Sequence, residues 1–178
     1  MKRPGPIPDS YWLVPDVLLA GEYPGAPKES RAREKLEKIL DAGIRTFIDL
    51  TESSEPLTKY DGLLRTLAVE RGLEVSYMRQ PVRDAGVPNE REQMTLILAT
   101  IREEITAGRP VYVHCWGGIG RTGTVAGCWL VEEGLAGADA IARIAELRGT
   151  PTDGWKASPE TDEQRRYICE WRAAEEAE

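Results

Sequence analysis

Two hydrophobic patterns alternate along the chain. Segments with apolar residues three or four positions apart are typical of helices that bury one face, and short continuous apolar runs are typical of strands buried on both faces. The first pattern predicts helices over residues 30–42, 56–71, 89–107, 122–133 and 138–148, and the second predicts strands over residues 44–50, 73–78 and 111–113. Helices that alternate with buried strands predict an α/β fold with a central, mainly parallel sheet flanked by helices.

Local signals predict where two of the helices begin. Asn89 and Glu92 stand three residues apart, which is the spacing of a capping box, and Gly108 is suited to end the same helix. Further along, Ser158 and Pro159 predict the N-cap and the first residue of a last helix.

The chain shows no internal repeat and no linker long enough to separate two domains. Residues 1–29 are rich in Pro and Gly but carry apolar residues such as Trp12 and Leu18, so we expect an extended lead-in that packs on the rest. Residues 30–178 then form one domain, a size at which a single hydrophobic core is usual.

Composition narrows the possible partners. The chain has 178 residues, of which 41% are hydrophobic and 30% charged, and a net charge of −7. A general binder of nucleic acid or of anionic membranes is more often basic, so neither is an expected partner. An anionic ligand therefore needs a local positive site. As a separate expectation, the chain is a monomer.

Three further features concern compartment and cofactors. Asp9, Pro15 and Asp16 interrupt the apolar residues near the start, which argues against a signal peptide, and no apolar run has membrane-spanning length. Three cysteines are too few for a disulfide framework. A single histidine argues against a His-rich metal centre. We therefore expect a cytoplasmic protein without a metal or other cofactor.

The segment His114–Thr122 carries the most informative chemistry in the chain. Between a predicted strand and a predicted helix it reads HCWGGIGRT, with three glycines in four positions. Glycines allow a tight turn that brings several backbone N–H groups to one point, and the N-terminus of the following helix adds more. Such a nest binds phosphate-like anions. We call residues 115–120 the glycine-rich loop, and its anion-binding residues are predicted to be Trp116, Gly117, Gly118, Ile119 and Gly120.

The side chains around this loop predict a nucleophile. Cys115 lies at the base of the nest, where N–H donors and Arg121 favour the thiolate. Arg121 can grip two anion oxygens through its planar guanidinium group. Thr122 is placed to donate a hydrogen bond to the Cys115 sulfur, and His114 is predicted to brace the loop. A glycine-rich turn or a lone cysteine has a purely structural alternative, but the combination favours chemistry.

The segment HCWGGIGRTG resembles the H-C-x5-R-[ST] signature of cysteine-dependent protein tyrosine and dual-specificity phosphatases. Within this group it resembles the cyclin-dependent-kinase-associated type. The resemblance implies a central, mainly parallel sheet flanked by helices, and metal-independent hydrolysis of phosphomonoesters through a cysteinyl-phosphate. It also makes Asp84, 31 residues before Cys115 in a Pro- and Gly-flanked loop, the general acid, and Gln164 the residue that positions water.

Several alternatives stay open. Asp49, Glu52, Asp61 and Asp153 are rival acids, and Gln164 has the alternative of a solvent-facing helix residue. The substrate is either a phosphorylated protein or a small phosphorylated molecule such as an inositol phosphate or a nucleotide. A phosphate-binding module without turnover and a thiol redox module are the alternatives to an enzyme. For Cys128 we expect core packing, with a disulfide to oxidised Cys115 as the alternative.

Overall fold

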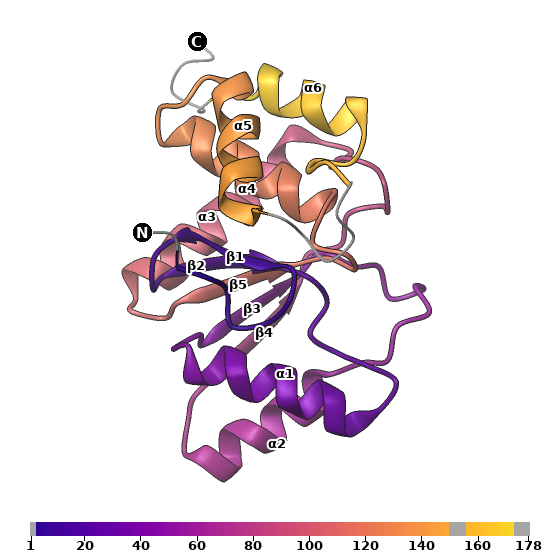
Figure 1. Cartoon of the computed structure of the whole chain (residues 1–178), viewed down its shortest axis with the longest axis vertical. Helices are drawn as coiled ribbons and strands as arrows, with labels where there is room; N and C mark the ends of the chain where they lie inside the picture. Colours follow the sequence, from indigo (N-terminus) through magenta and orange to yellow (C-terminus); the bar gives the residue numbers. More distant parts are fainter. Residues whose placement is uncertain (1–2, 150–155, 173–178) are drawn as a thin grey trace.

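The computed structural model describes residues 3–149 and 156–172. Within this part of the chain, five strands form one sheet in the order β1-β2-β5-β3-β4 (Figure 1). The strands are β1 Ser10–Val14, β2 Leu18–Gly21, β3 Thr46–Asp49, β4 Ser76–Arg79 and β5 Val111–His114. The helices are α1 Glu29–Asp41, α2 Asp61–Arg71, α3 Arg91–Thr106, α4 Arg121–Glu132, α5 Gly137–Arg148 and α6 Asp162–Glu170. Strands β2, β5, β3 and β4 pair in parallel and β1 is antiparallel at the edge, which confirms the predicted fold class.

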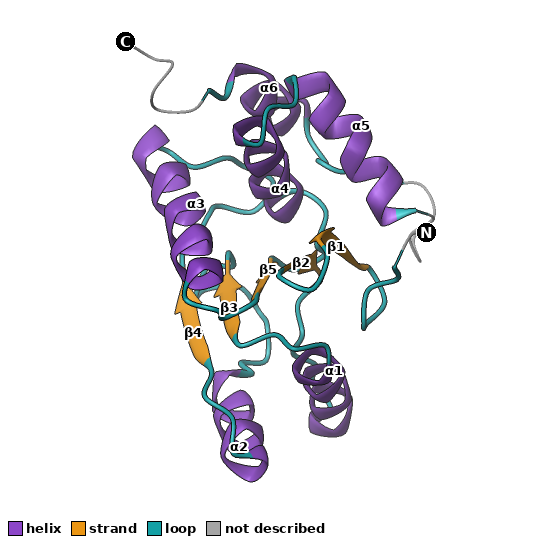
Figure 2. Ribbon diagram, turned by 90° about the vertical axis from the view of Figure 1, so that its left-hand side faces the viewer, coloured by secondary structure: helices purple, strands orange, loops and turns teal. Residues whose placement is uncertain are grey.

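Helices cover both faces of the sheet. Helices α1 and α2 lie on one face, and α3, α4, α5 and α6 lie on the other (Figure 2). Each face buries its own hydrophobic cluster. On the α1–α2 side the cluster includes Leu36, Phe47 and Leu64, and on the other side it includes Ile97, Val113 and Ile144. Strands β2, β3 and β5 are buried on both faces, which explains their short apolar runs, whereas β4 at the edge of the sheet is half-buried.

The N-terminal stretch contains two strands that the hydrophobic pattern did not identify. Strand β2 pairs with β5, so that Gly21 stands beside His114. All four residues of β2 are buried, and with so short a run no alternation distinguishes a strand from scattered apolar anchors. The division of the chain at residue 29 into a lead-in and a domain remains a proposal.

Helix boundaries differ from prediction where tertiary contacts compete with local signals. The helix predicted over residues 56–71 begins only at Asp61, as helix α2. Residues 50–60 form a loop, called the Glu55 loop below. Helix α3 has Glu90 as its N-cap without a side-chain cap, so the predicted capping box of Asn89 and Glu92 is wrong. The last helix is capped by Thr161, and the predicted N-cap Ser158 instead donates a hydrogen bond from its hydroxyl to the Ile119 carbonyl at 2.7 Å.

Parallel pairing brings three loops to one edge of the sheet. The last residue of β3, Asp49, stands beside the last residue of β5, His114, on one side. On the other side it stands beside the last residue of β4, Arg79. The Glu55 loop, the glycine-rich loop and the loop of residues 80–88, called the Asp84 loop, therefore start from the same edge. Ligands of open α/β sheets bind at this edge.

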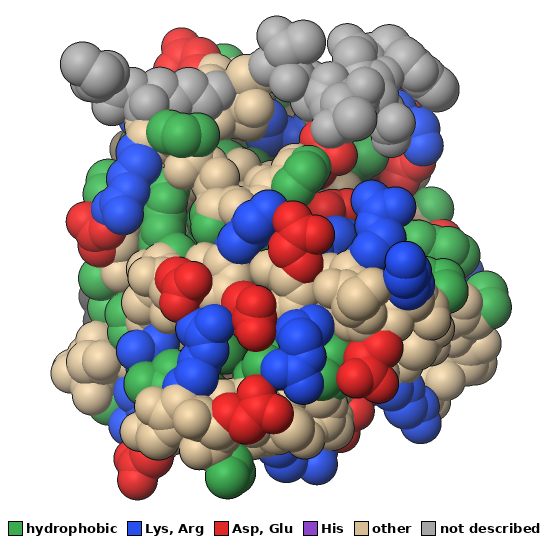
Figure 3. Space-filling view, turned by 60° about the horizontal axis from the view of Figure 1, so that its bottom comes forward, with side chains coloured by type: hydrophobic (Ala, Val, Ile, Leu, Met, Phe, Trp, Pro, Cys, Tyr) green, Lys and Arg blue, Asp and Glu red, His purple; other side chains and the backbone are tan. Residues whose placement is uncertain are grey.

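The surface of the α1–α2 layer mixes both signs of charge (Figure 3). Many of its cations are paired, as in Lys38–Glu34 at 2.7 Å and Arg33–Glu70 at 3.0 Å. No helix in the described ranges is long and apolar enough to cross a membrane.

Candidate active site

Close packing explains why the glycine-rich loop needs two of its glycines. Gly118 has a φ of +70°, and a Cβ there would lie 2.3 Å from the Gly21 carbonyl carbon. A Cβ on Gly120 would lie 2.8 Å from Nε2 of Gln164. The loop is thus held between the end of β2 and the start of α6, and larger residues at these two positions would force it open.

A hollow of about 300 Å³ lies over this loop. It is lined by Asp84, Cys115, Trp116, Gly117, Ile119, Gly120, Arg121, Lys156 and Glu160. Cys115 is 3% exposed, whereas Trp116 is 47% exposed at the rim. The structure thus brings the predicted nucleophile, arginine and acid to one pocket. Lys156 and Glu160 were not identified from the sequence; both lie in the loop before α6, and the predicted helix start at Ser158 had placed Glu160 inside a helix.

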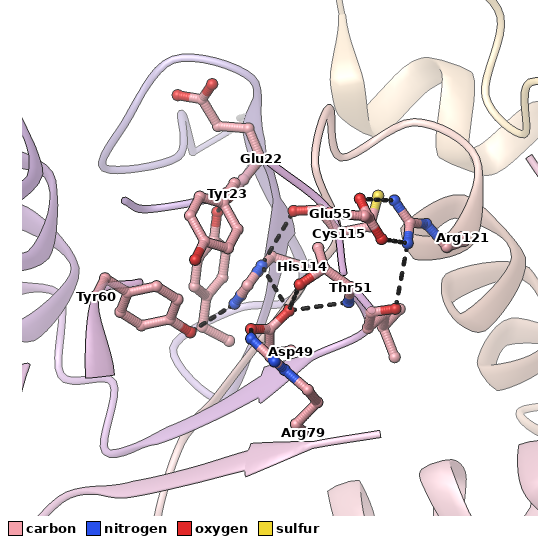
Figure 4. A network of polar contacts seen from close by, with 12 residues as sticks. Glu22, Tyr23, Asp49, Thr51, Glu55, Tyr60, Arg79, His114, Cys115 and Arg121 are labelled. Carbon is pink, nitrogen blue, oxygen red and sulfur yellow. Dashed lines mark hydrogen bonds and ion pairs between the residues drawn. The ribbon is translucent and has the colours of Figure 1, made fainter. Parts of the chain in front are cut away.

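Arg121 is buried and contacts both the Glu55 loop and the Asp84 loop. Its guanidinium group donates to both carboxylate oxygens of Glu55, at 2.5 and 3.0 Å, and to the Val82 carbonyl at 3.0 Å. It also lies 3.1 Å from Oδ1 of Asp84. Burial alone would lower the pKa of Arg121, but the neighbouring charges of Glu55 and Cys115 raise it above its usual value. Arg121 is therefore a fixed cation beside Cys115 (Figure 4).

Glu55 was missed by the sequence analysis. Burial alone would raise the pKa of its carboxyl, but the hydrogen bonds from Arg121 hold that pKa below the usual value. Its backbone neighbour Glu52 also donates an N–H to the same carboxylate at 2.8 Å. The signal available was an acidic residue in a polar loop directly after a buried strand, but several acids share that description.

Asp84 stands at the open side of the pocket. Its side chain is 63% exposed, and Oδ1 accepts a hydrogen bond from the Ala85 N–H at 3.0 Å. Ala85 has a φ of +56°, so the Asp84 loop turns sharply here. Of the other acids considered for this role, Asp49 is buried below the glycine-rich loop and Asp61 pairs with Arg65 on α2. Asp153 lies outside the described residues.

His114 belongs to a buried polar network below the glycine-rich loop (Figure 4). Its Nδ1 lies 3.1 Å from the Cys115 carbonyl and its Nε2 lies 2.6 Å from the Tyr60 hydroxyl. A carbonyl only accepts, so Nδ1 carries the proton and Nε2 accepts from Tyr60. This arrangement suits a neutral ring, in keeping with the burial that lowers the pKa of His114.

Asp49 holds the other side of the same network. One of its oxygens accepts from the Thr51 N–H at 2.9 Å and the Thr51 hydroxyl at 2.6 Å, and the other accepts from Tyr77 at 2.7 Å and Arg79 at 3.2 Å. Burial opposes ionisation of Asp49, but the hydrogen bonds from Thr51 and Tyr77 help to hold its pKa below the usual value. The network therefore anchors the start of both the Glu55 loop and the glycine-rich loop.

Thr122 and Gln164 differ from expectation in their contacts. The Thr122 hydroxyl is buried and has no hydrogen-bond partner among the described residues, so the predicted bond to Cys115 is not formed in this arrangement. Gln164 is also fully buried, which excludes the solvent-facing alternative. Its Nε2 donates to the Gly86 carbonyl at 3.0 Å, and its Oε1 completes a capping box with Thr161.

The other two cysteines lie away from this pocket. Cys128 is buried in α4, where burial raises the pKa of its thiol well above the usual value, and Cys169 is exposed on α6. Within the part of the chain that the structure describes, no group of three or more His, Cys, Asp or Glu side chains is placed to hold a metal ion.

A cysteine and an arginine at the two ends of a glycine-rich strand-to-helix loop define the class of cysteine-dependent phosphatases. Residues 24–135 match the family model described as "Polymorphic toxin system, DSP-PTPase phosphatase", and the chain belongs to this family.

Individual relatives agree with this assignment. The chain is 28% identical over 122 residues to "Putative tyrosine phosphatase 067L" of Invertebrate iridescent virus 3, a match that covers 67% of this chain and 44% of that protein. The matches to three curated relatives cover between 44% and 64% of those proteins. Tk-PTP in its active form is similar with a TM-score of 0.71 and 25% identity, over 93% of this chain and 99% of that one. Kinase associated phosphatase has the same fold, with a TM-score of 0.71 and 19% identity, over 97% and 98% of the two chains.

The buried contacts of Gln164 predict a measurable contribution to stability. Gln164→Leu should lower the free energy of unfolding by about 1–3 kcal/mol, because the Gly86 carbonyl and two backbone N–H groups lose a buried partner. Thr161→Ala removes only the cap and should cost about 1 kcal/mol, whereas Thr161→Ser keeps the hydroxyl and should match the parent. Urea unfolding of the three variants measures this, and a Gln164→Leu variant as stable as the parent would contradict the assigned contacts.

The chain's single histidine allows a direct test of the buried network. Burial lowers the pKa of His114 in the folded state, so the unfolded chain binds a proton first as pH falls. The free energy of unfolding should therefore decrease as pH drops below about 6.5, the usual pKa of histidine. NMR of the one imidazole gives the folded pKa, and His114→Gln should remove this part of the pH dependence. A midpoint at or above the usual value would refute the neutral ring.

Proposed function

We propose that this chain is a metal-independent phosphomonoester hydrolase that acts through a cysteinyl-phosphate intermediate. The observation that carries the proposal is the single pocket that holds Cys115, Arg121 and Asp84 over the glycine-rich loop. Membership of a phosphatase family supports it. The pocket is large enough for a phosphorylated side chain and is polar at its base.

The first step transfers the phosphoryl group to sulfur. The Cys115 thiolate attacks phosphorus in line with the leaving oxygen, the S–P bond forms and the P–O bond breaks. Backbone N–H groups of the loop and Arg121 stabilise the charge on the equatorial oxygens. Asp84 gives its proton to the leaving oxygen. The contact of Asp84 with Arg121 at the open side of the pocket supports this role.

The second step releases phosphate. Water attacks phosphorus, Asp84 accepts a proton from that water, and the S–P bond breaks to return the Cys115 thiolate. Gln164 borders Gly120 and holds Gly86 of the Asp84 loop, which supports a part in orienting that water. Thr122 would assist the leaving thiolate once its free hydroxyl turns toward the sulfur.

We propose a phosphorylated protein as the substrate. The name of the viral relative is that of a tyrosine phosphatase, and TpbA of P. aeruginosa, a neighbour in fold, was crystallised with pTyr. A small phosphorylated molecule is the second candidate, because PTPMT1, another neighbour in fold, was crystallised with PI(5)P. We further propose that the chain acts as a cytoplasmic monomer, in keeping with three free cysteines.

Replacing the nucleophile tests the proposal directly. Cys115→Ser should reduce hydrolysis of para-nitrophenyl phosphate to background, because the hydroxyl is far less ionised than a thiol, while phosphate binding is retained. Phosphate release and calorimetric binding of phosphate measure the two properties. EDTA should leave the parent active. A variant that hydrolyses the ester as fast as the parent, or parent activity that EDTA abolishes and zinc restores, would point to another mechanism. A parent that binds phosphate without hydrolysing any ester would instead be a binding module.

The general acid is tested by the leaving group. Asp84→Asn should slow hydrolysis of phenyl phosphate by about 10²–10⁴-fold, because the basic phenoxide needs a proton. Esters whose leaving group is a stable anion should be affected much less. We expect kcat/KM across substituted aryl phosphates to depend steeply on leaving-group pKa in the variant and weakly in the parent.

A matched control separates this effect from a change of charge. Asp139 is exposed on α5, away from the residues that line the pocket, so Asp139→Asn should keep the parent's weak dependence. If Asp84→Asn also kept the parent's slope, the acid would have to be sought elsewhere, with Glu160 first because it lines the same pocket.

A further inference from the structure

The hollow over Cys115 is called the catalytic pocket below. A second and larger hollow, here called the flanking pocket, adjoins it. Its volume is about 610 Å³, and its lining includes Tyr23, Lys28, Arg31, Lys35, Leu57 and Trp116. Trp116 lines both pockets and follows the nucleophile directly in the chain. A substrate whose phosphate sits over Cys115 can therefore extend past Trp116 into the flanking pocket.

One wall of the flanking pocket is bonded to the glycine-rich loop, and the other adjoins the partner of Arg121. On one side, the Tyr23 N–H donates to the Trp116 carbonyl at 2.8 Å. On the other side, the wall begins at Pro56, the residue after the Glu55 that pairs with Arg121. The flanking pocket is thus held in a fixed position relative to the phosphate site.

Three cations, Lys28, Arg31 and Lys35, and one carboxylate, Glu22, line this hollow. Lys35 is paired with Glu22 at 3.0 Å. Lys28 and Arg31 are exposed, and neither side chain makes a hydrogen bond or a close ion pair with a described residue, although the charge of Arg31 acts on the nearby carboxylates of Glu22 and Glu34. The chain as a whole carries a net charge of −7, so a local excess of cations beside the active site favours an anionic ligand there.

Helix α1 itself provides the contrast. Its cations outside the flanking pocket, Arg33 and Lys38, are each within 3.0 Å of a carboxylate. Lys28 and Arg31, which line the flanking pocket, have no carboxylate this close among the described residues. Positive charge that is only partly offset at this place is available to a ligand.

The walls also favour an apolar group. Trp116 is 47% exposed, and Tyr23 and Leu57 present ring and aliphatic surface next to it. A highly phosphorylated polyol carries no apolar group to cover such walls, whereas a peptide carries both apolar and acidic side chains.

We propose that the flanking pocket binds the part of a phosphorylated protein that adjoins the phosphorylated residue. One bulky apolar side chain fills the hollow against Trp116, and an acidic side chain pairs with Lys28 and Arg31. This assignment rests on the proposed function, whose substrate class it narrows to acidic phosphopeptide segments.

The test compares phenyl phosphate with phosphotyrosine peptides in each of three proteins. The substrates are phenyl phosphate and a phosphotyrosine peptide with Glu and Leu beside the phosphotyrosine, placed in turn on its N-terminal and C-terminal side. In the parent, kcat/KM should be higher for one of these peptides than for the same peptide with Lys and Ala instead. The double variant Lys28→Glu with Arg31→Glu should lower the ratio of kcat/KM for the preferred peptide to that for phenyl phosphate by about tenfold.

A control with the same change of net charge is available on the α1–α2 layer. Lys38 and Arg65 are exposed and lie outside the lining of both pockets. Lys38→Glu with Arg65→Glu should therefore keep the parent's ratio. Equal ratios in all three proteins, a fall of the same size in the control, or a preference for an inositol polyphosphate over every peptide would overturn the proposal.

Binding separates this proposal from the proposed function. The acidic phosphopeptide should bind Cys115→Ser more tightly than its Lys and Ala counterpart does, and the Lys28→Glu and Arg31→Glu changes should remove that difference. Calorimetry measures this without turnover, so a parent that hydrolysed nothing would refute the proposed function and leave the flanking pocket decided by binding alone. Equal affinity for both peptides would refute the flanking pocket.

Discussion

A buried guanidinium group organises this site. Placing the charge of Arg121 out of water is costly unless carboxylates and carbonyls surround it. Here the Glu55 loop supplies a carboxylate and the Leu50 carbonyl, and the Asp84 loop supplies the Val82 carbonyl. The need to pair one cation therefore draws two loops from neighbouring strands around the first residue of α4. The same contacts hold Arg121 in place beside Cys115.

The sequence predicted the parts of this site that depend on short-range chemistry. A cysteine, three glycines and an arginine within seven residues have few interpretations, and the alternation of helices and strands placed them at the carboxyl end of a strand. The fold class followed from the same alternation, because buried parallel strands differ clearly from amphipathic helices in their hydrophobic pattern.

The parts that the sequence did not reveal depend on long-range contacts. Glu55 is one of many acids, and only the folded chain shows that its carboxylate meets Arg121. Serine is a favoured N-cap residue, but the Ser158 hydroxyl donates to the Ile119 carbonyl. Thr161 caps the helix instead. Strand β2 is hidden because four buried residues carry too little pattern. The cap preference of Ser158 is worth about 1 kcal/mol, which one tertiary hydrogen bond can offset.

The contacts that hold the glycine-rich loop join segments that are far apart in the sequence. Arg121 and Glu55 are separated by 66 residues, and Gln164 and Gly86 by 78 residues. A partly folded chain that keeps its helices but loses the order of the sheet edge would keep none of these contacts. The catalytic geometry is therefore a property of the complete fold, and hydrolysis reports on the population of fully native molecules rather than on residual local structure.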